Sequence, residues 1–148
     1  MSNQKELLRA PFELAYKYKR SNGPVMSEFF KALADHKILG TQSNSGKVFS
    51  PAAEFDPETH ESLSNFKEVG PGGIVETFSW IENPLEHHLI KQPFAFALIR
   101  LDGADSAMLH MIAGCNEDEL NIGSRVLATW SDEKEERITD IKFFVLEA

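Results

Sequence analysis

Gln92 to Met111 reads Gln-Pro-Phe-Ala-Phe-Ala-Leu-Ile-Arg-Leu-Asp-Gly-Ala-Asp-Ser-Ala-Met-Leu-His-Met, with apolar runs at 94–101 and 107–113 around an Asp-Gly pair. This pattern predicts a β-hairpin, because glycine accepts the positive φ that a tight turn requires. As a strand, the first run would carry apolar side chains on both of its faces, and strands of this kind are covered on both faces. We therefore expect the hairpin to form the centre of a small β-barrel, covered outside by other parts of the chain or by a partner.

Composition narrows the class of protein. A chain of 148 residues is long enough for one domain with a real core. The single cysteine, Cys115, excludes an internal disulfide and fits a reducing compartment. The first residues lack the layout of a secretory signal, and no apolar run approaches the roughly 20 residues of a membrane span. We therefore expect a cytoplasmic protein with no membrane partner.

The formal net charge is -8, and the basic residues are scattered along the chain. Their densest group is Lys17, Lys19 and Arg20. Proteins that bind polyanions concentrate Lys and Arg on one face, because that charge supplies most of the affinity. The balance therefore disfavours nucleic acid and anionic membrane as partners.

The chain begins with an arm and a helix. Residues 1–22 form a polar arm in which Leu14, Tyr16 and Tyr18 alternate with more polar positions. The arm either packs on its own domain or wraps a partner, and the sequence leaves both open. Gly23-Pro24 predicts a helix start, since proline is tolerated at the first helical position. An apolar stripe at helical spacing continues to about residue 35.

Short strands follow. Residues 38–42 and 47–49 predict two strands joined by a turn, and residues 63–69 predict a third. Gly70-Pro71-Gly72-Gly73 is a strong break. Five further strands are predicted at 74–81, 94–101, 107–113, 124–130 and 138–146, with one helical turn capped by Asn116 after the third. Five strands with a short helix after the third match an OB-fold, a partly open Greek-key barrel.

This order of a helix, a small ribbon and five barrel strands resembles the acyl-CoA-associated OB-fold family, formerly a domain of unknown function with a rubredoxin-like zinc ribbon. The resemblance spans about residues 24–146, through 24–33, 38–40, 46–51, 68–75, 93–105 and 114–126. It implies a mainly β fold in three segments: arm and helix at 1–36, ribbon at 37–70, and OB-fold at 71–148. It also implies a non-catalytic accessory protein bound to a thiolase-fold enzyme, such as a lipid-transfer-type thiolase or aldolase, in acyl-CoA metabolism.

This chain lacks the zinc ligands that the resemblance would lead one to expect. Two Cys-x-x-Cys pairs hold the metal in zinc-bearing members, and the matching positions here are Gln42, Ser45, Asp56 and Thr59. A structural zinc site needs four thiolate or imidazole ligands in a closed tetrahedron. We therefore expect no zinc and a degenerate ribbon held by packing and hydrogen bonds. CoA or acyl-CoA would meet the protein through its partner enzyme.

An acidic loop could bind a hard cation. Glu54, Asp56, Glu58 and His60 alternate through residues 54–62, and Ca²⁺ prefers oxygen ligands. However, Pro57 interrupts the run, and no glycine-centred calcium loop is present. A solvated loop in place of the lost zinc turn is the preferred interpretation.

Three histidines are candidates for a catalytic or ligand role. His87 and His88 are adjacent in a polar link, and neighbouring side chains point in different directions, which disfavours a shared metal. His110 lies within an apolar strand, where a hydrogen-bonded core or interface histidine is favoured over a general base. No serine or aspartate in a recognisable catalytic motif stands near it.

The remaining candidates are two carboxylates and a thiol. Asp102 and Asp105 bracket the hairpin turn, where carboxylates usually accept backbone hydrogen bonds instead of performing acid–base work. Cys115 precedes a helix N-terminus, which can lower a thiol pKa, but no basic residue adjoins it. We therefore predict no catalytic residue and no metal ligand.

Aromatic rings leave one alternative function open. OB-folds that bind single-stranded nucleic acid stack bases on exposed rings along a basic groove. This chain supplies rings without the basic groove, so most are expected in the core, and surplus apolar surface would suit a protein partner. The rings are Phe78, Trp80, Phe94, Phe96, Trp130, Phe143 and Phe144.

A self-standing thioesterase or hydrolase is the third hypothesis, and the absence of a recognisable nucleophile motif disfavours it. The sequence also leaves open a homodimer through a strand edge or the N-terminal helix, because an unpaired strand edge invites pairing.

Overall fold

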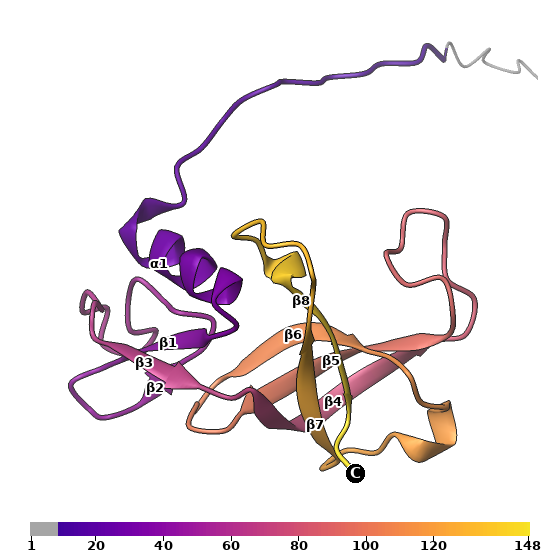
Figure 1. Ribbon diagram of the computed structural model, residues 1–148. Helices are drawn as coiled ribbons and strands as arrows, with labels where there is room; N and C mark the ends of the chain where they lie inside the picture. Colours follow the sequence, from indigo (N-terminus) through magenta and orange to yellow (C-terminus); the bar gives the residue numbers. More distant parts are fainter. Residues whose placement is uncertain (1–8) are drawn as a thin grey trace, which may run out of the picture.

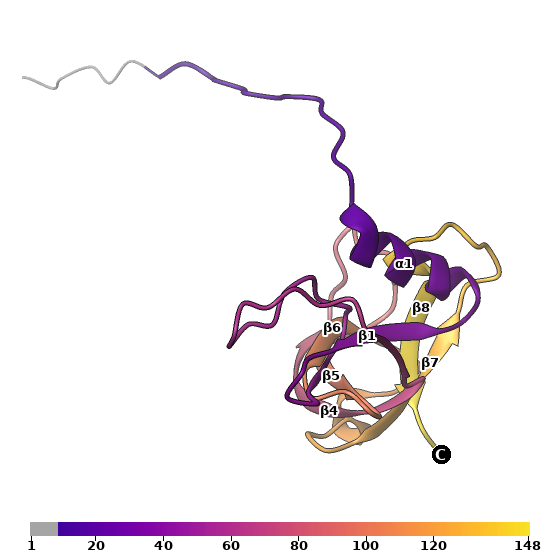
Figure 2. The ribbon, with the colours of Figure 1, turned by 90° about the vertical axis from the view of Figure 1, so that its left-hand side faces the viewer.

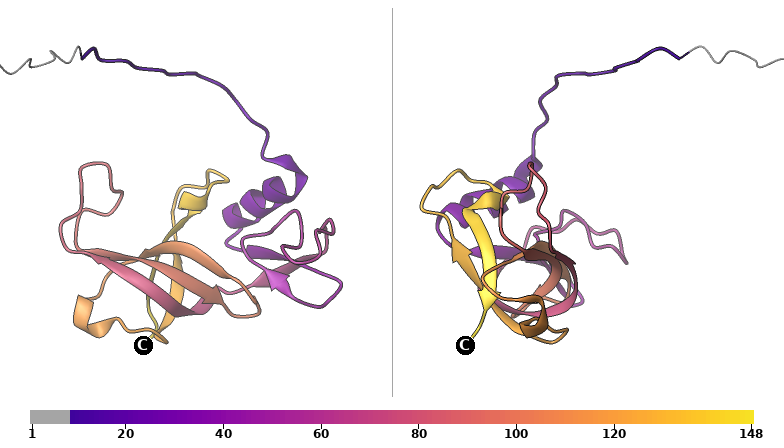
Figure 3. Two further views of the ribbon diagram at one scale, coloured as in Figure 1. Left: turned by 180° about the vertical axis from the view of Figure 1, so that it is seen from behind. Right: turned by 90° about the vertical axis from the view of Figure 1, so that its right-hand side faces the viewer.

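The computed structural model describes residues 9–148, and Figures 1 to 3 show an arm, a helix, a small ribbon and a barrel in chain order. The helix α1 (Gly23–Ala34) lies over the ribbon and one end of the barrel. The family-type fold expected from the sequence, mainly β with one N-terminal helix, is confirmed.

Helix α1 forms where the sequence predicts it. Pro24 occupies the first turn, and the apolar stripe Val25, Phe29 and Leu33 is buried. Each large side chain buried in this way contributes about 1.5–3 kcal/mol through removal of apolar surface from water. The helix ends at Ala34, and the next backbone N–H groups close its last turn on the carbonyls of residues 32 and 33.

The ribbon is a three-stranded antiparallel sheet in the order β2-β1-β3. Its strands are β1 (Ile38–Gln42), β2 (Val48–Phe49) and β3 (Phe66–Val69). The predicted third strand starts three residues late, because Leu63 is buried in the loop and its N–H donates to the Glu54 carbonyl (2.8 Å) instead of to the sheet.

The barrel is closed in the order β4-β5-β6-β8-β7. Its strands are β4 (Gly72–Ile81), β5 (Phe94–Leu101), β6 (Ala107–Ile112), β7 (Arg125–Trp130) and β8 (Ile141–Leu146). The β6–β8 pair is parallel and the others are antiparallel. The predicted helical turn is the 3-10 helix η1 (Glu117–Glu119), where the Asn116 N–H donates to the Glu119 carboxylate (2.6 Å).

In the barrel, two strands start two or more residues away from the predicted positions. Strand β4 starts at Gly72 instead of residue 74, because Gly72 and Gly73 already pair with Leu127 and Val126 of β7. A larger side chain at Gly73 would meet the Arg100 carbonyl, so glycine permits the close approach of β5. The last strand starts at residue 141, since residues 138–140 form a second 3-10 helix, η2 (Ile138–Asp140).

One buried cluster joins the three segments. Val25 and Leu33 of α1, Val69 of β3, and Ile99 and Phe144 of the barrel belong to the same apolar core. The expected boundary at residues 70–71 therefore marks a change of sheet, and packing continues across it.

Four hydrogen bonds fasten β2 to the β5–β6 turn, and we call them the hairpin clamp. The Val48 N–H donates to the Asp105 carboxylate (2.8 Å), and the Asp105 N–H donates to the Val48 carbonyl (2.8 Å). The Ser50 N–H donates to the Ser106 hydroxyl (2.8 Å), which in turn donates to the Ser50 carbonyl (3.0 Å). The ribbon is thus fixed to the tip of the central hairpin.

The outer face of that hairpin bears on the two kinds of cover expected for it, other parts of the chain or a partner. On β5 the inward positions are buried, whereas the outward Leu98 is 38% exposed. Other parts of the described chain therefore leave the outer face partly exposed, and cover by a partner stays a prediction.

Residues 9–22 form an extended arm. It projects away from helix α1 in every view (Figures 1, 2 and 3), and all of its residues are exposed. Of the two alternatives for this part of the arm, packing on its own domain is not what the structure shows. The prediction for residues 1–8 of the arm lies outside the described residues. Within 9–148, no helix combines the length and apolarity needed to cross a membrane.

Candidate functional site

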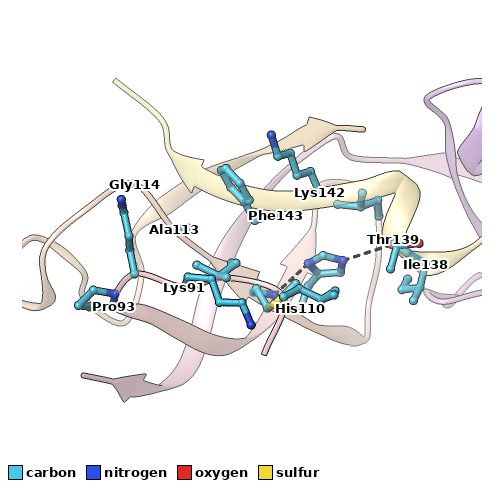
Figure 4. A pocket seen from close by; sticks show the side chains of 14 residues that line it. Lys91, Pro93, His110, Ala113, Gly114, Ile138, Thr139, Lys142 and Phe143 are labelled. Carbon is cyan, nitrogen blue, oxygen red and sulfur yellow. Dashed lines mark hydrogen bonds between the residues drawn. The ribbon is translucent and has the colours of Figure 1, made fainter. Parts of the chain in front are cut away.

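A cleft of about 610 Å³ opens beside β6 and β8, and Figure 4 shows its lining. Residues 89–93 of the β4–β5 loop form one wall, and Ile138, Ile141 and Phe143 form the other. Lys91 and Lys142 stand at its edges with their ammonium groups pointing in opposite directions (Figure 4). The charges do not converge, so the cleft offers an apolar surface and no built anion site.

His110 lies at the bottom of this cleft and is 7% exposed. Its Nδ1 accepts the Met111 N–H (2.9 Å), and Nε2 lies 3.5 Å from the Ile138 carbonyl. The ring also meets Phe144 edge-on at 5.5 Å. Burial lowers the pKa of His110, against the smaller opposing effect of its two backbone hydrogen bonds. The structure therefore places a neutral, hydrogen-bonded histidine here, as the strand pattern indicates.

An apolar surface follows the central hairpin on its outer side. Leu98 and Leu109 face each other across β5 and β6, and Leu109 is 63% exposed. The half-buried pair Phe96 and Met111 extends this surface along the same two strands. We call these four residues the β5–β6 apolar face. A hollow of about 300 Å³ continues from it toward His87 and Leu89.

His87 and His88 belong to the loop beside this face. The His88 ring packs edge-on against Phe94 and Phe96, at 5.4 and 5.9 Å, and its Nδ1 accepts the Leu85 N–H (3.1 Å). The two imidazoles meet at 76°, so their nitrogens do not converge. His88 therefore supports the loop, and the pair does not form the geometry of a metal site.

The two turns that contain Gln42, Ser45, Asp56 and Thr59 are held by polar contacts. We call residues 42–46 and 55–62 the two knuckles. Asp56, 2% exposed, accepts the N–H groups of Glu58 (2.7 Å) and Thr59 (3.1 Å), and these bonds lower its pKa. The hydroxyls of Ser43 and Ser45 lie 2.6 Å apart in the facing knuckle.

A second contact joins the knuckles directly. The Glu61 carboxylate accepts the backbone N–H (2.9 Å) and the side-chain amide (2.7 Å) of Asn44. Glu58 turns outward to Lys47 (2.5 Å), and the exposed His60 adopts a φ of 63°. The acidic loop residues thus diverge, and within residues 9–148 no three His, Cys, Asp or Glu side chains are grouped to hold a metal.

The hairpin carboxylates differ from the prediction that both serve the turn. Asp102 forms a bidentate ion pair with Arg125 of β7 (2.6 and 2.7 Å), and this pair lowers the pKa of the Asp102 carboxyl group. Asp105 does accept a backbone N–H, but from Val48 in the clamp. Arg125 was missed because 23 residues separate it from Asp102, and no local signal marks such a partner.

Cys115 and the aromatic rings are placed as follows. Burial and the neighbouring Glu119 carboxylate raise the pKa of the Cys115 thiol, which is the opposite of nucleophile activation.

Phe94 and Phe144 are fully buried, as expected of core rings. The other five rings are half-buried, so fewer are enclosed than predicted: Phe78, Trp80, Phe96, Trp130 and Phe143.

Comparisons with known proteins agree with this fold. Residues 66–131 match the family described as ChsH2, C-terminal OB-fold domain. A search of curated proteins gives no match. A solved protein of unknown function from the DUF35 family of Sulfolobus solfataricus superposes with a TM-score of 0.64 at 22% identity, over 84% of this chain and 87% of that one. A chain of the Ltp2-ChsH2(DUF35) aldolase superposes with a TM-score of 0.62 at 16% identity, over 89% and 98%.

The two solved structures share the fold with this chain at low identity. The sequence match adds a similarity to one family over part of the chain, since it runs from the start of β3 to the residue after β7. The resemblance inferred from the order of elements is confirmed. Through most of its barrel, the chain is similar to the ChsH2 C-terminal OB-fold domain, and the two solved structures share a DUF35-type OB-fold with it.

Proposed function

We propose that this chain is a non-catalytic accessory protein that docks on a partner enzyme through the β5–β6 apolar face. The observation that carries the proposal is the exposed pair Leu98 and Leu109 at the centre of two barrel strands. Clustered apolar side chains on a barrel surface are typical of protein interfaces. One structural neighbour, a chain of the Ltp2-ChsH2(DUF35) aldolase, supports an enzyme as the partner.

The partner is a thiolase-fold enzyme or a lipid-transfer-type thiolase or aldolase acting on acyl-CoA. The family resemblance supports this choice, and CoA reaches the accessory protein only within the assembly. In the proposed complex, the accessory chain stabilises its partner and lines part of the approach to the substrate site. Neither a zinc ion nor a catalytic group of this chain has a role in the proposal.

A protein partner fits this surface better than a polyanion does. The ion pair between Arg100 and Glu76 (2.9 Å) borders the apolar face, so a basic side chain there is already matched by an acid. Single-strand binding would require a continuous basic groove. An apolar centre with a polar border is instead the usual arrangement of a protein interface.

The test is capture of the enzyme by the tagged full-length chain from cells of its own source, followed by mass spectrometry. We expect a thiolase-fold enzyme to co-purify. The paired change Leu98→Asp and Leu109→Asp should weaken the complex by about 30-fold or more, because it places charges at the centre of the interface. Recovery of no such enzyme, or undiminished binding by the variant, would contradict the proposal.

Leu127→Asp is the matched control. Leu127 is 40% exposed on β7, close to the 38% of Leu98, but it lies on another side of the barrel. It therefore measures the cost of an aspartate on the barrel surface without touching the β5–β6 apolar face. The control variant should retain binding within about twofold of the unmodified chain.

A further inference from the structure

The arm and the rest of the described chain carry opposite charge. Residues 9–20 hold four basic side chains and one acidic one, whereas residues 21–148 hold ten basic and 21 acidic ones. Lys17, Lys19 and Arg20 have no ion-pair partner among the described residues. The arm is thus a basic segment attached to an acidic body.

The arm also has one strongly apolar side. Side chains alternate between the two faces of an extended segment. Phe12, Leu14, Tyr16 and Tyr18 therefore share a face, and their exposed fractions are 85%, 66%, 76% and 75%. Four large apolar side chains that are exposed to water at every second position indicate a segment that becomes buried against another surface.

A groove of about 780 Å³ with matching features lies at the base of the arm. Phe30, Leu89 and Ile138 provide its apolar part, and Asn22, the last residue of the arm, also lines it. Glu133, Glu135 and Glu136 line it together with Arg137, so acids outnumber bases. We call this feature the acidic groove.

The acidic side of the groove is held in a defined shape. The buried Asp140 carboxylate accepts the N–H groups of Glu135 (2.9 Å) and Glu136 (3.0 Å). The Asp140 carbonyl accepts the Ser131 N–H (2.9 Å), which closes the other end of the loop. The described structure shows no ion pair for the three glutamates of the groove. Their carboxylates are thus available to a basic segment without a change in the loop backbone.

We propose that residues 12–20 of one chain dock in the acidic groove of a second copy of the same chain, and that the exchange is reciprocal. The apolar side of the arm would lie on Phe30, Leu89 and Ile138, with Lys17, Lys19 and Arg20 toward the glutamates. Nine extended residues span about 30 Å, so the arm extends well beyond the rim of its own groove. Each arm leaves from the rim of its own groove, so a two-fold axis beside that rim brings both pairs together.

A second copy is the favoured occupant for two reasons. The arm points away from its own body in every view (Figures 1, 2 and 3), which suits exchange between molecules over folding back. The complementary charges also stand on the same chain, so two copies satisfy both arms and both grooves at once. This inference does not depend on the partner enzyme, and its test uses the purified chain alone.

The experiment is a charge swap followed by sedimentation velocity of the full-length protein over a range of concentrations. One variant carries Lys17→Glu, Lys19→Glu and Arg20→Glu, and the other carries Glu133→Lys, Glu135→Lys and Glu136→Lys. Each variant alone should dimerise about 100-fold more weakly than the unmodified chain, because like charges meet at both contacts. Their equimolar mixture should form a heterodimer within about tenfold of the original affinity, since both contacts regain opposite charges.

Controls separate the outcomes. The exposed pair Glu117→Lys and Asp118→Lys alters charge far from the groove and should leave dimerisation unchanged. Raising the salt concentration should weaken the unmodified dimer. A monomeric unmodified chain at 100 µM would overturn the proposal, whether its arm is free, folded back or reserved for another protein. A dimer that survives both charge reversals would overturn it as well.

Discussion

The barrel and the knuckles of the ribbon are stabilised by different interactions. Ile99, Ile112 and Phe144 fill the barrel with apolar contacts and are fully buried. At the knuckles, the carboxylates of Asp56 and Glu61 accept hydrogen bonds from backbone and side-chain N–H groups. The comparison shows that a segment too small for its own core can keep its shape through charged hydrogen bonds. We therefore expect the barrel to be sensitive to changes in side-chain volume and the knuckles to be sensitive to protonation of their carboxylates.

The largest expected effect is in the barrel. Phe144→Ala should lower the free energy of unfolding by about 3–5 kcal/mol, because it leaves a cavity among fully buried side chains. Urea denaturation followed by circular dichroism measures it. The neighbouring Phe143→Ala is the control, since Phe143 is half-buried and should cost about 1 kcal/mol. Equal losses at the two positions would show that the barrel interior is not where stability is concentrated.

The next effect is confined to the knuckles. Asp56→Ala removes the acceptor of two N–H groups, so the amides of Glu58 and Thr59 should exchange with solvent at least about tenfold faster. Hydrogen exchange followed by mass spectrometry compares peptides from residues 54–62 with peptides from β5. Glu54→Ala is the control in the same loop and should leave exchange nearly unchanged. Faster exchange throughout β5 would mean that the two regions open together.

Acid should open the knuckles before the barrel. The pKa of Asp56 is lowered in the folded chain, so the unfolded chain binds more protons between the folded value and the ordinary value of about 3.9. The stabilisation by Asp56 is therefore complete above about pH 4 and is lost as the pH falls through the folded pKa. Exchange in residues 54–62 at pH 3 and pH 6, corrected for intrinsic rates, measures this. An unchanged difference between knuckle and barrel protection would refute the assignment.

The smallest effect is expected at the ion pair between Asp102 and Arg125. Both side chains are about half exposed, and water screens such pairs. Arg125→Lys should lower Tm by less than any change above, and 1 M salt should reduce the difference further. A thermal melt at two salt concentrations decides this. A loss as large as that of Phe144→Ala would place an essential contact at the barrel edge.

Local signals in the sequence predicted the parts of the fold that depend on neighbouring residues. The Asp102-Gly103 turn is correct, with Gly103 at a φ of 86°, and Asn116 opens the short helix where expected. The strand start at 72 was missed because pairing with the distant β7 sets it, and the start at 141 was missed because residues 138–140 form a 3-10 helix instead. The β6–β8 pairing joins Ile112 to a residue 32 positions away and has no sequence signal.

The candidate residues divide in the same way. The alternating pattern around His110 predicted a buried, hydrogen-bonded histidine, and the structure shows one. Neither the bare outer side of Leu98 and Leu109 nor the acidic groove could be foreseen. Exposure depends on which segments fold over a face, and the groove joins residue 30 to residues 131–140. The arm alternation was visible in the sequence, but its direction was not.

The hairpin clamp bears on the order in which the chain can acquire its shape. It ties residues 48–50 to residues 105–106, more than fifty positions later. A ribosome makes residues 48–50 first, and at that moment their partners in the clamp do not yet exist. The clamp can therefore close only after the β5–β6 turn has been synthesised, so the ribbon is attached to the barrel late in the production of the chain.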